Sequence, residues 1–368
     1  MTKNKTKLGL ILGGRSGEHE VSLISAWNIF HGLDRKKYEV FLLGIDKQGI
    51  WHFGKDEKFW LSPEVPKKVK LNLKTSIITI ARKKKEIVAL DLATGKNLAK
   101  FDVFFPITHG TFGEDGCLQG MLEMLDAPYV GPGVLGSAVG MDKDVAKRLL
   151  RDAGLNVSKF HILRVGEDIL KSLSKIIADL KFPIFVKPAS LGSSVGISKA
   201  ENKQELISAI KLAFQYDNKI ILEQTVFGRE IECSVLGNAK PLASIPGEIQ
   251  LAKGFYSYAA KYVEADSAKP VVRAELPTSI AKKIQKLAVE VFETLECEGM
   301  GRVDFFLTKE NKIFVNEINT LPGFTSISMY PKMLEQTGIK YSDLLDKLIS
   351  LALERKEKQR KLKRDFKA

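Results

Sequence analysis

The sequence predicts an α/β protein with more than one domain. Two apolar runs, Leu8–Leu12 and Asp102–Ile107, each lead into a glycine-rich turn and then into a helical pattern. A strand, a glycine turn and a helix open an α/β unit, and ligands bind such units at the carboxyl ends of the strands. At 368 residues the chain exceeds one small core, so two or three domains around a shared cleft are expected.

The first domain is expected to contain both of these strands. A helix begins at Glu18, directly after the first glycine turn, and a further strand is predicted over Tyr38–Ile45. The second turn, residues 108–116, places His109 at the same sheet edge as Glu18, although a histidine in this position is as often structural as catalytic. Residues 46–100 are predicted to form a peripheral β-ribbon, to which we assign no chemistry.

The composition predicts a cytosolic protein. Hydrophobic residues make up 44% of the chain, yet no apolar run approaches the ~18–20 residues of a membrane-spanning helix. The apolar run after the basic N-terminus is too short for a secretion signal. The three cysteines, Cys117, Cys233 and Cys297, are odd in number and far apart, which favours reduced thiols over disulfides or a zinc site.

The formal net charge of +13 raises the question of nucleic-acid binding. The basic excess lies in blocks, including residues 82–85 and 355–364, which is typical of solvated faces and chain ends. No zinc-finger, helix-turn-helix or aromatic RNA-binding pattern accompanies these blocks. Nucleic acid is therefore not expected as the primary partner, and a field that attracts anionic nucleotides is the simpler explanation.

A new pattern starts at residue 142 and predicts a phosphate site. Asp142 is suited to cap a helix over residues 142–150, and Lys187 lies on a strand over 182–188. The next segment, 189–198, is rich in glycine and serine, so its N–H and hydroxyl groups can surround phosphate oxygens, although it lacks the ending of a P-loop. The alternative is a mobile surface hairpin, but the strand lysine just upstream favours phosphate binding.

A strand, a short linker and another strand follow over residues 219–236. Such an element between two lobes can hold an adenine against its backbone, with Glu230 near the ribose hydroxyls. The aromatic segment 254–262 is bounded by glycine and is expected to close over a site. An amphipathic helix over 277–295 and a last helix from Tyr341 complete the predicted elements.

The hairpin predicted over Gly301–Gly323 contains the candidate metal ligands. Side chains alternate between the faces of a strand, so Glu317 and Asn319 share a face, and Asp304 joins them if the two strands pair. These oxygen ligands suit Mg²⁺, which prefers a few carboxylates plus substrate phosphates. Arg302 supplies a fixed cation on the same face, and the turn that ends the segment can direct N–H groups to the same point. The alternative is a solvated hairpin with ordinary surface charges.

The order of these elements resembles the ATP-grasp superfamily. A closer resemblance is to D-alanine:D-alanine ligases, and it rests on seven motifs between residues 13 and 328: GGRSGEHEVS, HGTFGEDG, MDK, VKPASLGSSVG, FYSYAAKY, GRVDFF and NEINTLPGFTSIS. The resemblance implies a Rossmann-like parallel-sheet domain followed by a two-lobed ATP-grasp fold of α+β type. The implied boundaries are a substrate-binding domain over 1–141, a central lobe over 142–224, a catalytic lobe over 225–354 and a basic tail over 355–368.

The resemblance also implies the reaction. In such ligases ATP phosphorylates the carboxylate of one D-alanine, and the amine of a second attacks the acyl phosphate through a tetrahedral intermediate. The product is the dipeptide used in peptidoglycan synthesis. The protein's task is then to position groups and neutralise charge, which needs no protein nucleophile.

The implied site residues divide between ATP and D-alanine. Those for ATP are Lys143, Lys187 and Ser194 at the phosphates, Glu223 and Val226 at the adenine, and Glu230 at the ribose. Asp304, Glu317 and Asn319 would hold two Mg²⁺ or Mn²⁺ ions, and Arg302 and the N–H of Gly323 would stabilise the oxyanion. Those for D-alanine are Glu18 at the first ammonium group, Ser193 and Tyr262 linked to Glu18, Lys261 and Ser328 at the second carboxylate, and His109 close by.

The sequence leaves two alternative functions open and departs from the family pattern at two places. The acceptor could be D-serine or D-lactate, although Tyr262 in its loop favours the dipeptide, or the chain could be an inactive ATP-binding scaffold, which the full set of charged residues disfavours. Cys117 stands where threonine is expected in this family, and the basic tail lies outside the family pattern. A homodimer is the expected assembly.

Overall fold

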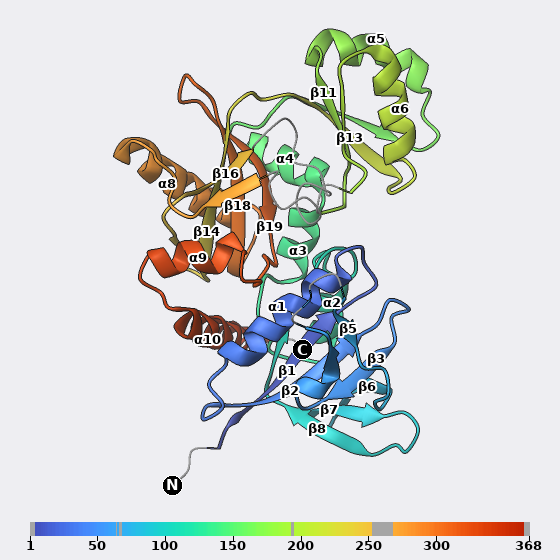
Figure 1. Cartoon of the computed structure of the whole chain (residues 1–368), viewed down its shortest axis with the longest axis vertical. Coiled ribbons are helices and arrows are strands. Elements are labelled where there is room, and N and C mark those ends of the chain that lie inside the picture. The colour runs from blue at the N-terminus through green and yellow to red at the C-terminus, as the bar shows by residue number, and fades with distance from the viewer. Residues whose placement is uncertain (1–3, 64, 66–67, 193–194, 252–267, 364–368) are drawn as a thin grey trace.

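The computed structural model describes residues 4–63, 65, 68–192, 195–251 and 268–363. Its three larger sheets lie in different parts of the molecule. In Figure 1 the N-terminal sheet lies at the bottom, a four-stranded antiparallel sheet at the top, and a six-stranded antiparallel sheet between them on the left.

The N-terminal sheet has the strand order β3-β2-β1-β9. Strands β1 (Thr6–Gly13), β2 (Tyr38–Ile45) and β9 (Val103–Pro106) are parallel, and β3 (Trp51–Gly54) is antiparallel at one edge. Leu8, Leu10 and Leu12 of β1 pack with α1 (His19–Gly32), whereas Ile11 packs on the opposite face with α2 (Cys117–Met124). Because helices or strands cover both faces, β1 is apolar almost throughout, as expected for a parallel-sheet strand.

The segment predicted as a peripheral ribbon, residues 46–100, lies mostly in short strands beside this sheet, but its first strand, β3, belongs to the sheet itself. Strands β6 (Ile78–Lys83), β7 (Glu86–Asp91) and β8 (Asn97–Phe101) form an antiparallel sheet. The other elements of the segment are the 3₁₀ turn Glu57–Phe59 and the paired strands β4 (Trp60–Leu61) and β5 (Lys70–Leu71).

The central part begins with two helices, α3 (Val134–Met141) and α4 (Lys143–Asp152). Asp142 accepts hydrogen bonds from the N–H groups of Asp144 and Val145, both 3.1 Å long, which confirms its predicted capping role. The sheet that follows has the order β10-β13-β11-β12, made of Phe160–Arg164, Lys219–Gln224, Ile184–Pro188 and Ser198–Ala200. Helices α5 (Ile169–Leu180) and α6 (Lys203–Ala213) share its hydrophobic core.

The C-terminal part contains the predicted hairpin. Strands β17 (Ala268–Val271), β16 (Gly247–Leu251), β14 (Arg229–Gly237), β18 (Gly299–Leu307) and β19 (Ile313–Asn319) lie side by side in this order, and β15 (Leu242–Ala243) pairs with β14. Helix α8 (Thr278–Thr294) packs against β14, β18 and β19, as expected for the predicted amphipathic helix. The pairing of β18 with β19 confirms the hairpin.

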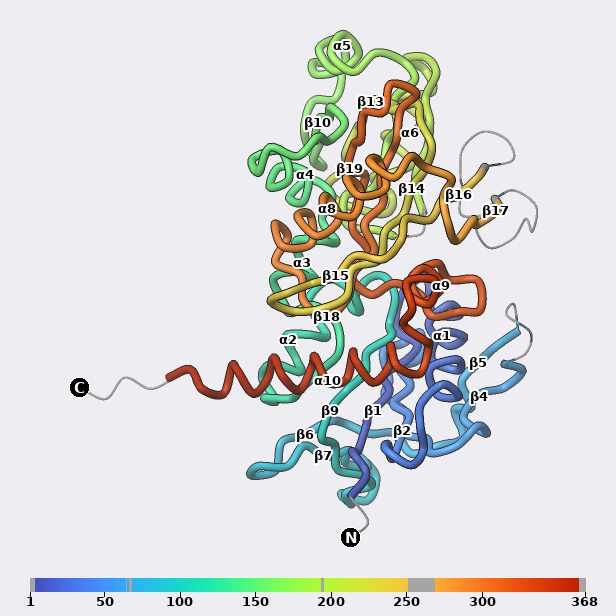
Figure 2. The backbone as a smooth tube through the Cα atoms, turned by 90° about the vertical axis from the view of Figure 1, so that its left-hand side faces the viewer, coloured from blue at the N-terminus to red at the C-terminus, as the bar shows by residue number. Residues whose placement is uncertain are grey.

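Two helices return the chain toward the N-terminal sheet. Helix α9 (Met329–Gln336) packs on β14, and α10 (Tyr341–Arg360) runs on past β18 and β9 (Figure 2). Helix α10 continues into the segment expected as a basic tail, where Arg355 and Lys356 are only 5% and 2% exposed. Over the described residues, none of the helices combines the length and apolar character that crossing a membrane requires.

Candidate active site

The hairpin brings the predicted metal ligands together. Asp304 lies opposite Glu317, and Arg302 lies opposite Asn319, so all four side chains share one face of the sheet. Asn319 Nδ2 lies 2.9 Å from Asp304 Oδ2. Arg302 binds the same carboxylate twice, from Nε to Oδ1 at 2.8 Å and from Nη2 to Oδ2 at 2.7 Å.

A third carboxylate, Glu232, faces Arg302 from the neighbouring strand β14. Its Oε1 lies 3.3 Å from Arg302 Nε, and Glu232 is the register partner of Asp304. Burial would lower the pKa of Arg302, but Asp304 and Glu232 outweigh it and hold this pKa well above its usual range. The guanidinium is therefore permanently charged and held in place from both sides.

Lys143 connects the central part of the chain to this hairpin. As the first residue of α4 it donates a 2.6 Å hydrogen bond from Nζ to the carbonyl oxygen of Leu191, and Nζ lies 3.5 Å from Glu317 Oε2. The side chain is 8% exposed. One ammonium group therefore contacts both the glycine-serine segment and a candidate metal ligand.

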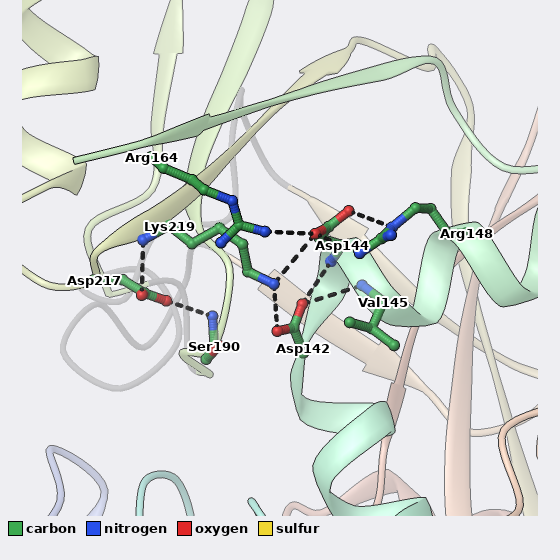
Figure 3. Close-up of polar contacts among 8 residues, drawn as sticks. All are labelled: Asp142, Asp144, Val145, Arg148, Arg164, Ser190, Asp217 and Lys219. Carbon is green, nitrogen blue, oxygen red and sulfur yellow. Dashed lines mark hydrogen bonds and ion pairs between the residues drawn. The ribbon is translucent and has the colours of Figure 1, made fainter. Parts of the chain in front are cut away.

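A network of ion pairs holds the start of α4 against the glycine-serine segment (Figure 3). Lys219 Nζ lies 2.5 Å from Asp142 Oδ2 and 3.2 Å from Asp144 Oδ2. Asp217, two residues before Lys219, accepts a 2.8 Å hydrogen bond from the N–H of Ser190. Because the backbone N–H of Lys143 also donates to Ala189, the network orients the α4 lysine and the adjoining loop as one unit.

Lys187 and Glu223 form a buried pair on adjacent strands of the central sheet. Lys187 Nζ lies 3.1 Å from Glu223 Oε2, and a second lysine, Lys147 of α4, lies 3.5 Å from Oε1. Burial would raise the pKa of Glu223, but Lys147 and Lys187 outweigh it and lower this pKa to about 2. Burial would lower the pKa of Lys187, but Glu223 and then Glu317 raise it.

Glu18 of the N-terminal domain lies close to the glycine-serine segment. A Cβ atom at Gly192 would lie 2.9 Å from Glu18 Oε2, and one at Gly110 would lie 3.1 Å from it. Glycine at these two positions therefore leaves room for the carboxylate between the two loops. Gly110 also has a φ of +78°, a conformation that disfavours other residues.

His109 is buried between the N-terminal sheet and the chain after β19. Its Nδ1 lies 3.0 Å from the carbonyl oxygen of Leu321 and 3.3 Å from Glu114 Oε1, and its Nε2 lies 3.1 Å from Ser25 Oγ. Burial alone would lower the pKa of His109, but Glu114 outweighs it and raises this pKa. His109 therefore joins two parts of the site, and at 4% exposure it lies behind the site surface.

The turn after β19 is closed by local hydrogen bonds. Ser328 Oγ accepts from the N–H of Thr325 at 2.9 Å and lies 2.8 Å from its hydroxyl. A Cβ atom at Gly323 would lie 2.8 Å from Ser328 Oγ, and the next N–H, of Phe324, donates to Ser25 Oγ at 3.2 Å. Gly323 and Ser328 are thus neighbours, as the two predicted roles require.

The remaining predicted residues divide into two sets. Val226 lies in the linker between β13 and β14, and Glu230 lies on β14 opposite Ile249. Ser193, Ser194, Lys261 and Tyr262 lie outside the described residues, as does the whole aromatic segment 254–262 expected to close over the site.

Sequence reasoning missed several residues of this region. Lys147 follows Lys143 by one helical turn, and Glu232 follows Glu230 by one strand repeat, so periodicity places each on the same face as a predicted residue. Glu114 lies in the glycine turn of His109. The spacing in the sequence could therefore have identified Lys147, Glu232 and Glu114. It gives no indication that Lys219 pairs with Asp142 and Asp144.

Two family models match the chain. One, described as D-ala D-ala ligase N-terminus, matches residues 7–132, and the other, described as D-ala D-ala ligase C-terminus, matches residues 149–350. The chain belongs to the D-alanine–D-alanine ligase family. A family member named D-alanine–D-alanine ligase, from Oceanobacillus iheyensis, is 50% identical over 361 residues, 98% of each chain.

Solved structures of this family have the same fold. The D-alanine-D-alanine ligase from Coxiella burnetii matches with a TM-score of 0.84 and 40% identity over 97% of this chain and 96% of its own. A D-Ala:D-Ser ligase from Enterococcus faecalis gives 0.84 and 37% over 95% and 100%. The Bacillus anthracis D-alanine–D-alanine ligase complexed with ATP gives 0.71 and 29% over 96% and 99%. These matches confirm the predicted fold, a parallel-sheet domain followed by an ATP-grasp fold.

Proposed function

We propose that this chain joins two D-alanine molecules into D-alanyl-D-alanine and converts ATP to ADP and phosphate, for peptidoglycan synthesis. The observation that carries the proposal is the contact between Lys143 and Glu317, which brings a candidate phosphate-binding lysine to the hairpin of Arg302 and Asp304. Family membership supplies the reaction, and this contact supplies a place where ATP and the acyl group can meet.

In the first step, a carboxylate oxygen of the first D-alanine attacks the γ-phosphorus of ATP, and ADP leaves. Lys143 and Lys187 hold the phosphates, because both ammonium groups are largely buried and both interact with the charge of Glu317 on the hairpin. Glu18 binds the ammonium group of this D-alanine, and its position between Gly110 and Gly192 supports that role. Holding both reactants in place supplies much of the catalysis.

Asp304, Glu317 and Asn319 fit the two Mg²⁺ or Mn²⁺ ions that the family implies. Two carboxylates and an amide oxygen on one face of paired strands are hard ligands, and Mg²⁺ takes a few such ligands together with phosphate oxygens and water. Within the described parts of the chain, no cluster of three or more His, Cys, Asp or Glu side chains is arranged for a metal. When bound, the ions would neutralise charge on the phosphates.

In the second step, the amine of the second D-alanine attacks the acyl carbon, phosphate leaves, and the nitrogen loses a proton. Arg302 and the N–H of Gly323 stabilise the oxyanion, and the fixed charge of Arg302 supports this role because preorganised donors need no rearrangement during the reaction. Ser328 and Lys261 hold the second carboxylate, with His109 close to it. Ser193 and Tyr262 link the loops to Glu18.

The nucleotide base lies at the linker between β13 and β14. Glu223 Oε1 is buried and accepts no hydrogen bond from the described residues, although Lys147 Nζ lies 3.5 Å away, so it can accept from the adenine amino group. Val226 contributes backbone groups, Glu230 binds the ribose, and Ser194 assists at the phosphates.

We further propose a homodimer located in the cytoplasm, and light scattering with size-exclusion chromatography tests the assembly.

D-serine as the acceptor is the second candidate. The similarity to a D-Ala:D-Ser ligase at 37% identity over nearly the whole chain favours it as the main competitor. The test is phosphate release from ATP and Mg²⁺ with D-alanine, L-alanine or no amino acid, with the product identified by mass. D-alanine-dependent release with a dipeptide product supports the proposal. D-serine or D-lactate competition that yields a mixed product supports the alternative, and ATP binding without release indicates a scaffold.

A further inference from the structure

Lys147 is a buried lysine for which the proposed reaction has no role. It follows Lys143 by one turn of α4 and is 2% exposed. Its Nζ donates a 3.1 Å hydrogen bond to Ser158 Oγ and lies 3.5 Å from Glu223 Oε1. A fully buried ammonium group is costly unless it is paired, so its position calls for an explanation beyond packing.

Glu223 is shared between two lysines that approach opposite oxygens. Lys187 Nζ lies 3.1 Å from Oε2, and Lys147 Nζ lies 3.5 Å from Oε1. Ser158 connects the two sides, since its hydroxyl accepts from Lys147 and donates to Glu223 Oε2 at 3.3 Å. All of these groups are less than 10% exposed, so water screens their charges little.

The charges of this cluster do not cancel. One carboxylate faces two ammonium groups, so the trio of Lys147, Lys187 and Glu223 carries a net positive charge. If Lys187 were the only partner of Glu223, the two would form a neutral pair, and the attraction of Lys187 for an anion would be weak. The second lysine neutralises part of the carboxylate's negative charge. Lys187 therefore keeps a net positive charge toward an anion.

We infer that Lys147 is a positioning residue for nucleotide binding, which acts through Glu223 to keep Lys187 effectively cationic toward the phosphates. The inference rests on the proposed function, because it takes Lys187 as a phosphate ligand. Burial lowers the pKa of Lys147, and Glu223 acts against this shift. Helix α4 thus supplies Lys143, which contacts the nucleotide, and Lys147, which maintains the positive charge that Lys187 presents to the phosphates.

The first test compares ATP binding by the full-length protein and its variants. Lys147→Met and Lys147→Gln remove the charge, and the glutamine variant keeps a donor for Ser158. Both should raise the Kd for ATP, measured by calorimetry with Mg²⁺, by about tenfold. This is the size expected for the loss of one charge-assisted contact. The KM for D-alanine should stay within about twofold. Lys211→Met, an exposed lysine on α6, is the matched control and should leave the Kd unchanged.

A double-mutant cycle separates this role from a structural one. In a Glu223→Gln background, Lys147→Met should change the Kd for ATP by less than about twofold, because the carboxylate through which Lys147 acts is gone. An equal loss in both backgrounds overturns the inference, as does a lower melting temperature with an unchanged Kd. If the wild type binds ATP but forms no dipeptide, the proposed function fails while the binding test still decides the role of Lys147.

Discussion

Arg302 and Asp304 form a two-point ion pair along a single strand. The distances are 2.8 Å from Nε to Oδ1 and 2.7 Å from Nη2 to Oδ2. A guanidinium is planar and presents parallel N–H groups, so this geometry fixes both side chains on the face of β18 that also receives Glu232 and Asn319. A proposed oxyanion donor and a proposed metal ligand therefore depend on each other for their positions.

Removing Arg302 should affect turnover far more than nucleotide binding. Arg302→Ala is expected to lower kcat by about 10²–10³-fold, the effect typical of losing one oxyanion donor, while the Kd for ATP changes little. Steady-state kinetics and calorimetry measure the two quantities. Arg273→Ala, at an exposed arginine of the same lobe, is the control and should change neither. Equal losses in turnover and ATP binding would count against the assigned role.

Glu317→Gln should raise the Mg²⁺ concentration needed for half-maximal activity by about tenfold or more. The amide keeps the size of the side chain but removes the charge that would hold the cation, and it weakens the contact with Lys143. A Mg²⁺ titration at saturating ATP measures the effect. Glu310→Gln changes an exposed carboxylate at the turn of the same hairpin and is the control. An unchanged midpoint would remove Glu317 from the metal site.

The lowered pKa of Glu223 predicts a specific acid sensitivity. Folding lowers this pKa from 4.5 to about 2, so the stabilisation is present above pH 4.5 and is lost as the pH falls toward 2. In that window the free energy of unfolding of the wild type should fall more steeply than that of Glu223→Gln, by up to about 1.4 kcal/mol per pH unit. Urea unfolding at several pH values from 5 to 3 measures the slopes. Identical slopes would show that Glu223 has an ordinary pKa.

The basic end of α10 is expected to stabilise the fold. Arg355 donates to the carbonyl oxygens of Gly131 at 2.5 Å and Tyr129 at 2.8 Å, and it stacks on the Tyr129 ring. Arg355→Met leaves both carbonyl groups without this donor, so the free energy of unfolding should fall by about 2–4 kcal/mol. Urea denaturation measures the loss. Lys358→Met, at an exposed position on the same helix, should cost less than about 0.5 kcal/mol. A similar loss in the two variants would show that Arg355 has no special role.

Much of the candidate site could be predicted from local sequence. Strand alternation places Glu317 and Asn319 on one face of β19, but Asp304 lies on the same face only because the register shifts by one residue between Asp304 and Phe305. Asp142 caps α4 for an equally local reason, since its side chain reaches the N–H groups two and three residues ahead. Where one residue of such a repeat was identified, the next one, Lys147 or Glu232, could have been found by the same reasoning.

The sequence by itself determined the α/β class, the hairpin, the capped helix and, through seven motifs in order, the family. These properties depend on residues within a few positions of one another, where backbone geometry leaves few choices. The tertiary structure alone decided that Lys143 meets Glu317, that Glu18 lies between two glycine loops, and that Arg355 is buried. Such contacts join segments far apart in the chain, and they depend on how sheets and helices pack, which no local pattern specifies.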